Sequence, residues 1–344
     1  MATLPPWGRR ARWLFGALLL VSLFVAIWDH QGRWHTPGAQ WRHFAKLWLY
    51  WAVHLAGWLL PALWASMWLS AKGLARLKLS LVFVLTVLGL WSSLIEPRWI
   101  AVRETTIKGV PAQAQPLRLA VVADVHWGLF FRDYQLEALV ERLNAMDVDA
   151  VVVAGDWTYE PTLDLQTGLA PLARIRHPVW GVLGNHDVQA PGPDLTQALR
   201  EALTQHGVRL LEGRVVPWKG WELVGLDDEW GGRPQAQIQA LWPSGRVASA
   251  APRLVVAHQP DTIEHLPAGA AFLSLSGHTH GGQIWIPGLT TWVLRHTSSP
   301  VHEWWNGLYD TPAGHLLVTP GIGMIGLPAR LAVRPTIERI DLVH

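Results

Sequence analysis

Two histidines stand one residue apart in the segment Gly277-His278-Thr279-His280-Gly281-Gly282, which follows the apolar run 271–275. In an extended strand, side chains two positions apart face the same side, so both imidazoles would point one way. The glycines permit a sharp turn and a close approach of the backbone to whatever the imidazoles face. Imidazole is the commonest nitrogen ligand of protein-bound metals, so the pair predicts a metal site. The alternative is an exposed glycine-rich loop, and partners elsewhere in the chain decide between the two.

Polar residues of the same kind follow four other apolar runs. The five runs that we predict to be buried strands are 117–122, 148–154, 179–183, 254–257 and 271–276. The residues just after them include Asp124, His126, Asp156, Asn185, His186, His258, His278 and His280. Taken singly, each has an ordinary explanation as a loop cap, a turn residue or a buried histidine. Ligands of open α/β sheets bind outside the carboxyl ends of the strands, so eight such residues at five strand ends indicate one shared site.

The segments between these strands predict an α/β fold. Residues 134–146 place Leu136, Leu139, Val140 and Leu143 on one helical face, and a second helix is predicted within 195–206. A hairpin is predicted within 209–226, and strands at 316–319 and 337–343 close the domain. Helices that alternate with buried strands are typical of layered α/β domains.

The order of these motifs resembles that of the calcineurin-like metallophosphoesterases. The motifs are Asp-x-His, Gly-Asp, Gly-Asn-His-Asp, a lone His after a strand, and Gly-His-Thr-His. Further segments resemble the membrane-associated bacterial phosphodiesterase branch, namely Gly-Gly-Gln at 281–283, Gly225-Leu226-Asp227-Asp228, Gly321-Ile322-Gly323 and Leu327-Pro328-Ala329-Arg330. The resemblance covers about residues 101–344. One departure is Trp157-Thr158-Tyr159 after Gly-Asp, where the family more often has aliphatic residues and another acid, and this would alter the wall of the pocket.

The resemblance implies a four-layer α-β-β-α sandwich over 101–344 that holds two divalent transition-metal ions. One ion would be bound by Asp124, His126 and His280, the other by Asn185, His258 and His278, and Asp156 would bridge them. A metal-bridged hydroxide would attack a phosphodiester or phosphomonoester, and His186 would assist the leaving group. Asp187 would either orient His186 or act as a structural loop acid. Four imidazoles without a thiolate suit Mn, Fe, Zn or Co better than Mg or Ca.

The first hundred residues differ in character from the rest. They contain three uncharged runs, at 13–28, 47–70 and 79–95. A bilayer core of ~30 Å takes about 20 helical residues, so the second and third runs are long enough and the first is marginal. Twelve of the 23 tryptophans lie in this region, many near the ends of runs, as in an aromatic belt. We predict about three transmembrane helices that anchor the protein and do not catalyse. The alternatives are buried helices of a soluble domain and, for the first run, a cleaved signal peptide.

The charges are divided in the same way. Residues 1–100 carry a net charge of +8 and residues 101–344 a net charge of −6. The latter show no basic patch, so a nucleic-acid partner is not expected, and the lack of cysteine excludes disulfides. Three basic residues in the loop 71–78 place that loop in the cytoplasm by the positive-inside rule. The domain would then lie on the periplasmic side of a bacterial inner membrane, although basic residues number six on each side.

Two other functions compete with a membrane-anchored phosphoesterase. One is a lipid-linked pyrophosphatase, such as a hydrolase of UDP-diacylglucosamine, because an anchor would hold the site at the bilayer. The other is a membrane metal-binding protein without turnover, which the presence of both His186 and Asp156 disfavours. No pattern in the sequence predicts an oligomeric state.

Overall fold

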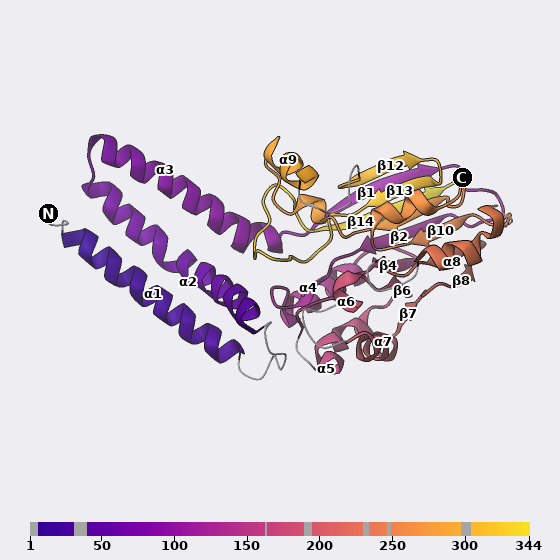
Figure 1. Ribbon diagram of the computed structural model, residues 1–344, viewed down its shortest axis with the longest axis horizontal. Coiled ribbons are helices and arrows are strands. Elements are labelled where there is room, and N and C mark those ends of the chain that lie inside the picture. The colour runs from indigo at the N-terminus through magenta and orange to yellow at the C-terminus, as the bar shows by residue number, and fades with distance from the viewer. Residues whose placement is uncertain are drawn as a thin grey trace.

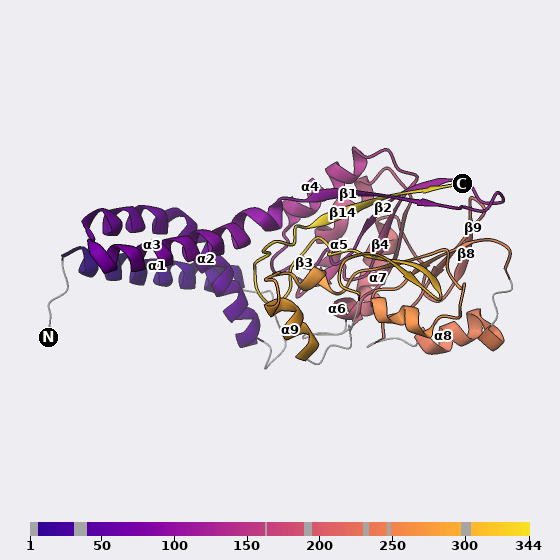
Figure 2. The same ribbon diagram turned by 90° about the horizontal axis from the view of Figure 1, so that it is seen from above.

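The computed structural model describes residues 6–30, 40–161, 164–188, 195–229, 234–245, 249–296 and 304–344. A bundle of three long helices projects from one end of a domain built on two sheets (Figures 1 and 2). The chain forms the bundle first and then the domain, which begins at β1 (Ala101–Lys108). We call this second part, from β1 to the end of the chain, the sandwich domain.

The first two uncharged runs of the sequence lie in the first two helices of the bundle, and the third begins in the last helix and ends in the turn after it. The helices are α1 (Pro6–His30), α2 (Gln40–Ser70) and α3 (Gly73–Leu90). Two short turns, η1 (Trp91–Ile95) and η2 (Glu96–Arg98), lead from α3 to the sandwich domain. None of the residues Gly73–Leu90, all of which the structure describes, is buried. An apolar helix without a buried residue needs another apolar environment to cover it.

The prediction of three membrane spans is not confirmed. Among the described residues, one stretch of 26 residues is long and apolar enough to cross a membrane, Gly73–Arg98. Trp13–Asp29 is apolar but shorter. The uncharged run in α2 includes tyrosine, histidine and several tryptophans, whose polar atoms make it less apolar than its lack of charge suggests.

The sandwich domain contains two six-stranded mixed sheets. The first has the order β1-β14-β2-β4-β6-β7 and the second the order β12-β13-β11-β10-β9-β8. The other strands of the first sheet are β2 (Leu117–Val122), β4 (Ala150–Ala154), β6 (Val179–Val182), β7 (Val208–Leu210) and β14 (Thr336–Val343). Those of the second are β8 (Val215–Trp218), β9 (Trp221–Gly225), β10 (Arg253–Val256), β11 (Leu273–Ser276), β12 (Gly307–Thr311) and β13 (Gly314–Val318). A small parallel pair joins β3 (Trp127–Gly128) to β5 (Thr158–Tyr159).

Helices and short turns connect the strands of the sandwich domain. The helices are α4 (Asp133–Asn144), α5 (Leu165–Leu169), α6 (Asn185–Val188), α7 (Thr196–Gln205), α8 (Pro234–Leu241) and α9 (Leu289–His296). The turns are η3 (Ala170–Arg174), η4 (Pro243–Gly245), η5 (Pro260–His265) and η6 (His280–Gly282).

Three apolar clusters give the sandwich domain four layers. One lies between the two sheets and includes Leu119, Val152 and Leu275. The second packs α4, α5 and α7 on the outer face of the first sheet, and the third packs α8 and η5 on the outer face of the second. Strands buried on both faces read as continuous apolar runs, which explains why all five residues of β4 are buried and apolar.

Candidate metal centre

The predicted site residues come from loops at one edge of the sandwich. Asp124 and His126 follow β2, Asp156 follows β4, and Asn185 begins α6 after β6. From the second sheet, His258 follows β10, and His278 and His280 follow β11. β2, β4 and β6 are parallel neighbours, as are β10 and β11, so their carboxyl ends meet at the same edge of each sheet. The structure therefore brings these seven side chains together.

Backbone hydrogen bonds hold the loops against one another. The Asp124 N–H donates to Gly155 O and the His126 N–H to Asp156 O, each at 3.0 Å. Across the second sheet, the Gly277 N–H donates to His258 O, also at 3.0 Å. Backbone hydrogen bonds alone thus hold these loops against their neighbours.

Five of the seven residues have left-handed backbone conformations. The φ angles are 50° at Asp124, 51° at His126 and His280, 55° at Asp156 and 69° at His278. Residues other than glycine rarely adopt this backbone conformation because it is strained. The strain persists only where the surrounding structure enforces it. Clusters of strained residues occur at functional sites, so the backbone conformations also indicate a functional site at this edge of the sandwich.

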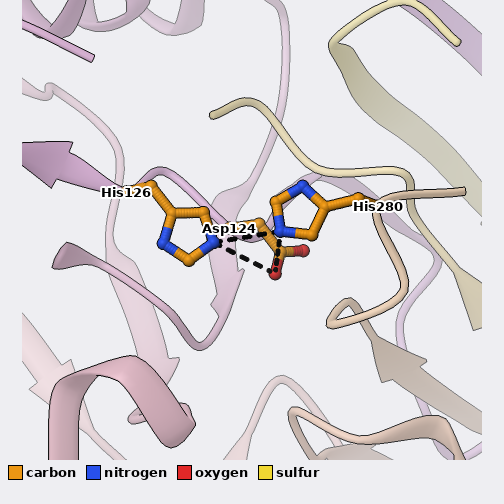
Figure 3. A group of neighbouring side chains, drawn as sticks. All are labelled: Asp124, His126 and His280. Carbon is orange, nitrogen blue, oxygen red and sulfur yellow. Dashed lines mark hydrogen bonds and ion pairs between the residues drawn. The ribbon is translucent and has the colours of Figure 1, made fainter. Parts of the chain in front are cut away.

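The first group of candidate ligands consists of Asp124, His126 and His280 (Figure 3). The two imidazoles are stacked, and the Nε2 atoms of His126 and His280 are 3.0 Å apart. Asp124 Oδ1 lies 3.5 Å from His280 Nε2 and 3.8 Å from His126 Nε2. Two nitrogens and a carboxylate oxygen thus converge on one point.

The second group joins His258, His278 and Asn185. Asn185 Oδ1 lies 3.1 Å from His258 Nε2 and 3.0 Å from His278 Nδ1. Asp156 lies between the groups, because its Oδ2 is 3.1 Å from His258 Nε2 and 3.6 Å from His126 Nε2. Asp124 also forms a compact set with Asp156 and His258, in which the ligand atoms lie within 4.8 Å of one another.

Burial keeps three of the imidazoles neutral. Burial lowers the pKa of His126 and of His278 to about 3, and it lowers that of His280 well below the usual value. The neutral imidazole is the form that binds a metal, so these three residues are ready to act as ligands at neutral pH.

Asp156 and His258 behave as a coupled pair. Burial opposes ionisation of both, but His258 and then His186 hold the pKa of Asp156 well below its usual range. In the same way, the Asp156 carboxylate overcomes the effect of burial and raises the pKa of His258 to about 10. A metal ion bound at His258 would replace this proton, since metal ligands must be deprotonated. Two buried carboxylates among four imidazoles fit divalent metal ions.

Two glycines make room for these side chains. A Cβ added at Gly155 would lie 2.6 Å from His258 Nδ1, and one added at Gly277 would lie 2.5 Å from Asp124 Oδ2. Real Cβ atoms do not approach so closely, so the glycines of the Gly-Asp and Gly-His-Thr-His motifs allow the ligands to pack against the neighbouring loops.

His186 lies beside the ligands without joining either group. Its backbone N–H donates to Asp156 Oδ1 at 2.9 Å. Its half-buried ring packs edge-to-face against His126 and Tyr159, with centroid distances of 5.3 and 5.1 Å. The ring is therefore held next to the site by its neighbours and by the short α6.

Asp187 is a structural loop acid. Its carboxylate accepts hydrogen bonds from the backbone N–H groups of Gly184, Trp157 and Thr158 and from the Thr158 hydroxyl, at 3.0–3.1 Å. These contacts join the loop after β4 to the loop after β6. Of the two roles that the sequence left open, the observed hydrogen bonds support this one.

The sequence did not predict a contact between the bundle and the site. Lys46 of α2 donates to the Tyr159 hydroxyl at 2.6 Å and forms an ion pair with Glu160. His43, also of α2, lies 2.9 Å from the other Glu160 oxygen. Tyr159 in turn packs against His126 and His186. The Trp-Thr-Tyr departure after Gly-Asp was a signal, because it placed an unusual aromatic residue at the pocket wall.

Arg330 supports His280 from behind. Its guanidinium is fully buried, donates to the carbonyls of Pro320 and Gly323 at 2.7–2.9 Å, and lies 3.4 Å from His280 Nδ1. Burial lowers the pKa of Arg330 to about 10, so the side chain remains charged at neutral pH. The motif at 327–330 that the sequence singled out thus contains a residue that contacts a candidate ligand.

Comparison with known proteins agrees with this site. Residues 117–283 match the family model of the calcineurin-like phosphoesterases. The match contains all seven candidate ligands, so residues 117–283 form a calcineurin-like phosphoesterase domain. Proteins of this family are metallophosphoesterases, which bind divalent metals and act on phosphoesters.

The names of similar proteins also refer to phosphodiesterases and metallophosphoesterases. The chain is 28% identical over 259 residues to phosphodiesterase YaeI of Escherichia coli K12. The aligned region covers 72% of this chain and 90% of that protein. It is 28% identical over 258 residues to the uncharacterized metallophosphoesterase YkuE of Bacillus subtilis, covering 72% and 87%. It is also 27% identical over 284 residues to a transmembrane protein with metallophosphoesterase domain of Danio rerio, covering 77% and 62%.

Proposed function

We propose that the chain is a membrane-anchored phosphoesterase that uses two divalent transition-metal ions to hydrolyse phosphodiesters or phosphomonoesters. The observation that carries the proposal is the position of Asp156, whose Oδ2 faces His126 of one ligand group and His258 of the other. A carboxylate between two imidazole sets suits a pair of cations, which is the arrangement used to clamp both oxygens of an in-line displacement.

We assign the ligands as the family resemblance implies. One ion would be held by Asp124, His126 and His280, the other by Asn185, His258 and His278, and Asp156 would serve both. Bound ions of this kind, with Mn, Fe and Zn as the best candidates, supply Lewis-acid stabilisation of phosphoryl oxygens and activate water as a nucleophile. Two carboxylates cannot neutralise two divalent ions, so the loaded site keeps a positive charge that attracts an anionic phosphoester.

His186 is the proposed proton donor to the leaving group. Its ring lies beside the ligands without belonging to either group, which leaves it available to a substrate. The Asp156 carboxylate fixes the His186 backbone, and the ring of Tyr159 fixes its orientation. A histidine held in this way can give a proton to a departing oxygen at neutral pH.

The helices of the bundle are the proposed membrane anchor. α3 has no buried residue, and its leucines at 81 and 85 are exposed. Trp91 and Trp99, at the end of α3 nearest the sandwich domain, are exposed where an aromatic belt would be. We propose that α1 and α2 cross the same bilayer and that the sandwich domain lies on the periplasmic face. Enzyme reporters fused after His344 test this orientation, and activity of a cytoplasmic reporter would reverse it.

A second candidate function is hydrolysis of a lipid-linked phosphoester or pyrophosphate. It is favoured by the apolar cluster that packs Leu47 and Tyr50 of α2 against Leu129, Phe130 and Tyr159 of the site loops. This cluster brings the proposed anchor next to the metal centre, where a lipid-borne phosphate would arrive. Assays of the detergent-purified, Mn-loaded protein on aryl phosphoesters and on lipid pyrophosphates separate the two substrate classes.

Metal analysis tests the dinuclear centre. We expect two ions per chain, and we expect Asp156→Ala to lose both while Asp124→Ala loses one. The matched control is Asp310→Ala, which removes an exposed carboxylate on β12 and should keep two ions. One ion or none in active protein would refute the proposal. Loss of both ions in Asp124→Ala, with one retained in Asp156→Ala, would assign the bridge to Asp124.

A further inference from the structure

The helix α9 presents its apolar side chains to the outside. Leu289, Trp292 and Val293 are exposed, Trp292 by 59%, and they lie at i, i+3 and i+4 on one helical face. Ile286, three residues before Leu289, is exposed as well. The buried side of the helix carries Thr290, whose hydroxyl accepts the Ile286 N–H at 2.7 Å and donates to Ile284 O at 2.8 Å. A polar residue inside and apolar residues outside is the reverse of the pattern on a water-exposed helix.

The position of α9 indicates what covers this face. Figures 1 and 2 both place α9 at the end of the sandwich domain nearest the bundle. The same end holds Trp91 and Trp99, where α3 passes into the domain, and the guanidinium of Arg334 lies over the Trp99 ring at 3.9 Å. Exposed tryptophans and arginines are enriched at the headgroup level of a bilayer.

We propose that α9 and Ile286 form an interfacial membrane contact that lies in the headgroup region of the bilayer that holds the bundle. This inference rests on the proposed anchoring. A short helix with an apolar face that includes tryptophan binds parallel to the membrane plane, with that face in the acyl boundary. A lipid surface is the partner because α9 lies at the end of the sandwich domain nearest the bundle, and the bundle helix α3 has no buried residue.

This contact connects the lipid surface to the metal centre. Ile286 comes six residues after His280, and Gln283 clamps the connection. The Gln283 amide donates to the carbonyls of Ile325 and Leu327 at 3.0 and 3.1 Å, and its oxygen accepts the Ile325 N–H at 2.9 Å. The backbone of the same loop pairs with Leu331, next to Arg330. The rim of the site is therefore held at the bilayer surface, where phosphoesters of amphiphilic molecules are presented.

Spin labels can read this contact directly, because the chain has no cysteine to remove. Single labels are placed on the full chain through Leu289→Cys and, separately, Trp292→Cys. A label at Leu85→Cys on α3 reports on the anchor, and one at Glu104→Cys on the exposed edge strand β1 reports on water. Each protein is reconstituted in vesicles of phosphatidylcholine and phosphatidylglycerol, and collisions with oxygen and with a water-soluble nickel chelate are compared.

We expect the labels at positions 289 and 292 to collide often with oxygen and rarely with the nickel chelate, as the label at position 85 on α3 should. Frequent nickel collisions at both, with a lipid signal at 85, would overturn the inference and leave the anchor intact. Shielding from both reagents would assign the face to a protein partner and would also overturn it. A water-like label at 85 would instead refute the anchoring on which the inference rests.

Discussion

The edge that carries the candidate metal ligands and the junction between the bundle and the sandwich domain are positioned in different ways. At the edge, each ligand follows a buried strand, and the sheet places the strand ends side by side. At the junction, single side chains meet partners that lie more than a hundred positions away. Asp29 pairs with Arg132, Lys46 with Glu160, and Glu96 accepts the Val333 N–H. Regular strands position the edge, whereas isolated long-range contacts between side chains hold the junction.

The two regions nevertheless meet at one residue. Tyr159 accepts a hydrogen bond from Lys46 on one side and packs against His186 and His126 on the other. Glu96 and the Ser92 carbonyl hold the loop of Arg330, which contacts His280. The bundle and the turns after α3 thus contact the surroundings of the site at two points, so we expect the proposed anchor to help position the site.

The largest effect should follow from removing a ligand. We expect His278→Ala to lose one ion and to bring hydrolysis close to background, because changes that merely misorient a ligand already cost about 10–100-fold. Added metal should restore part of the activity. Elemental analysis and titration with Mn measure both effects. Unchanged metal content would show that the edge of the sheet does not bind metal through this residue.

The next effect separates His186 from its neighbours. His186→Ala should keep both ions and lower kcat by about 10²–10⁴-fold, the range for removing a general acid or base. The decrease should be smaller for a p-nitrophenyl phosphodiester, whose leaving group needs little protonation. Parallel metal analysis is the control. Loss of metal in this variant would make His186 a ligand, and unchanged kcat on a poor leaving group would show that no acid acts there.

The sequence predicts the ligand-bearing edge well and the junction poorly. β2 was predicted with its observed bounds, and the five strand ends were placed to within one residue, because buried strands produce apolar runs that end in polar loops. The junction was not predicted, since one ion pair between Lys46 and Glu160 leaves no periodic trace. Membrane crossing was predicted from missing charge, but tryptophan, tyrosine and histidine lower the apolarity of α2. The short α9 was missed because its exposed apolar face does not resemble a helix packed on a core.

A third prediction asks whether the junction affects catalysis. Lys46→Met removes the charge that pairs with the buried Glu160 and the donor to Tyr159. We expect unchanged metal content, a lower Tm, and kcat reduced by about tenfold, since a displacement of about 1 Å at a positioning group can cost about 10²-fold and the displacement here should be smaller. Lys72→Met, at the far end of the bundle, is the matched control.

If Lys46→Met destabilises the protein and leaves kcat unchanged, the bundle is an anchor alone, as the sequence predicted. A larger effect on KM than on kcat would instead indicate that the junction shapes the approach of the substrate. Assays at saturating Mn keep metal loss from imitating either result.

The smallest effect should come from Tyr159→Phe, which separates the hydroxyl of this residue from its ring. The hydroxyl accepts hydrogen bonds from Lys46 and from the Gly326 N–H, so its loss should reduce the free energy of unfolding by about 0.5–1.5 kcal/mol. The ring would still pack against His186, so kcat should fall less than in Lys46→Met. Lys46 keeps Glu160 as a partner in this variant, whereas Lys46→Met leaves a buried carboxylate with His43 alone. A decrease in kcat as large as that of His186→Ala would mean that the phenol itself acts on the substrate, and the division between the ligand-bearing edge and its supporting junction would then fail at Tyr159.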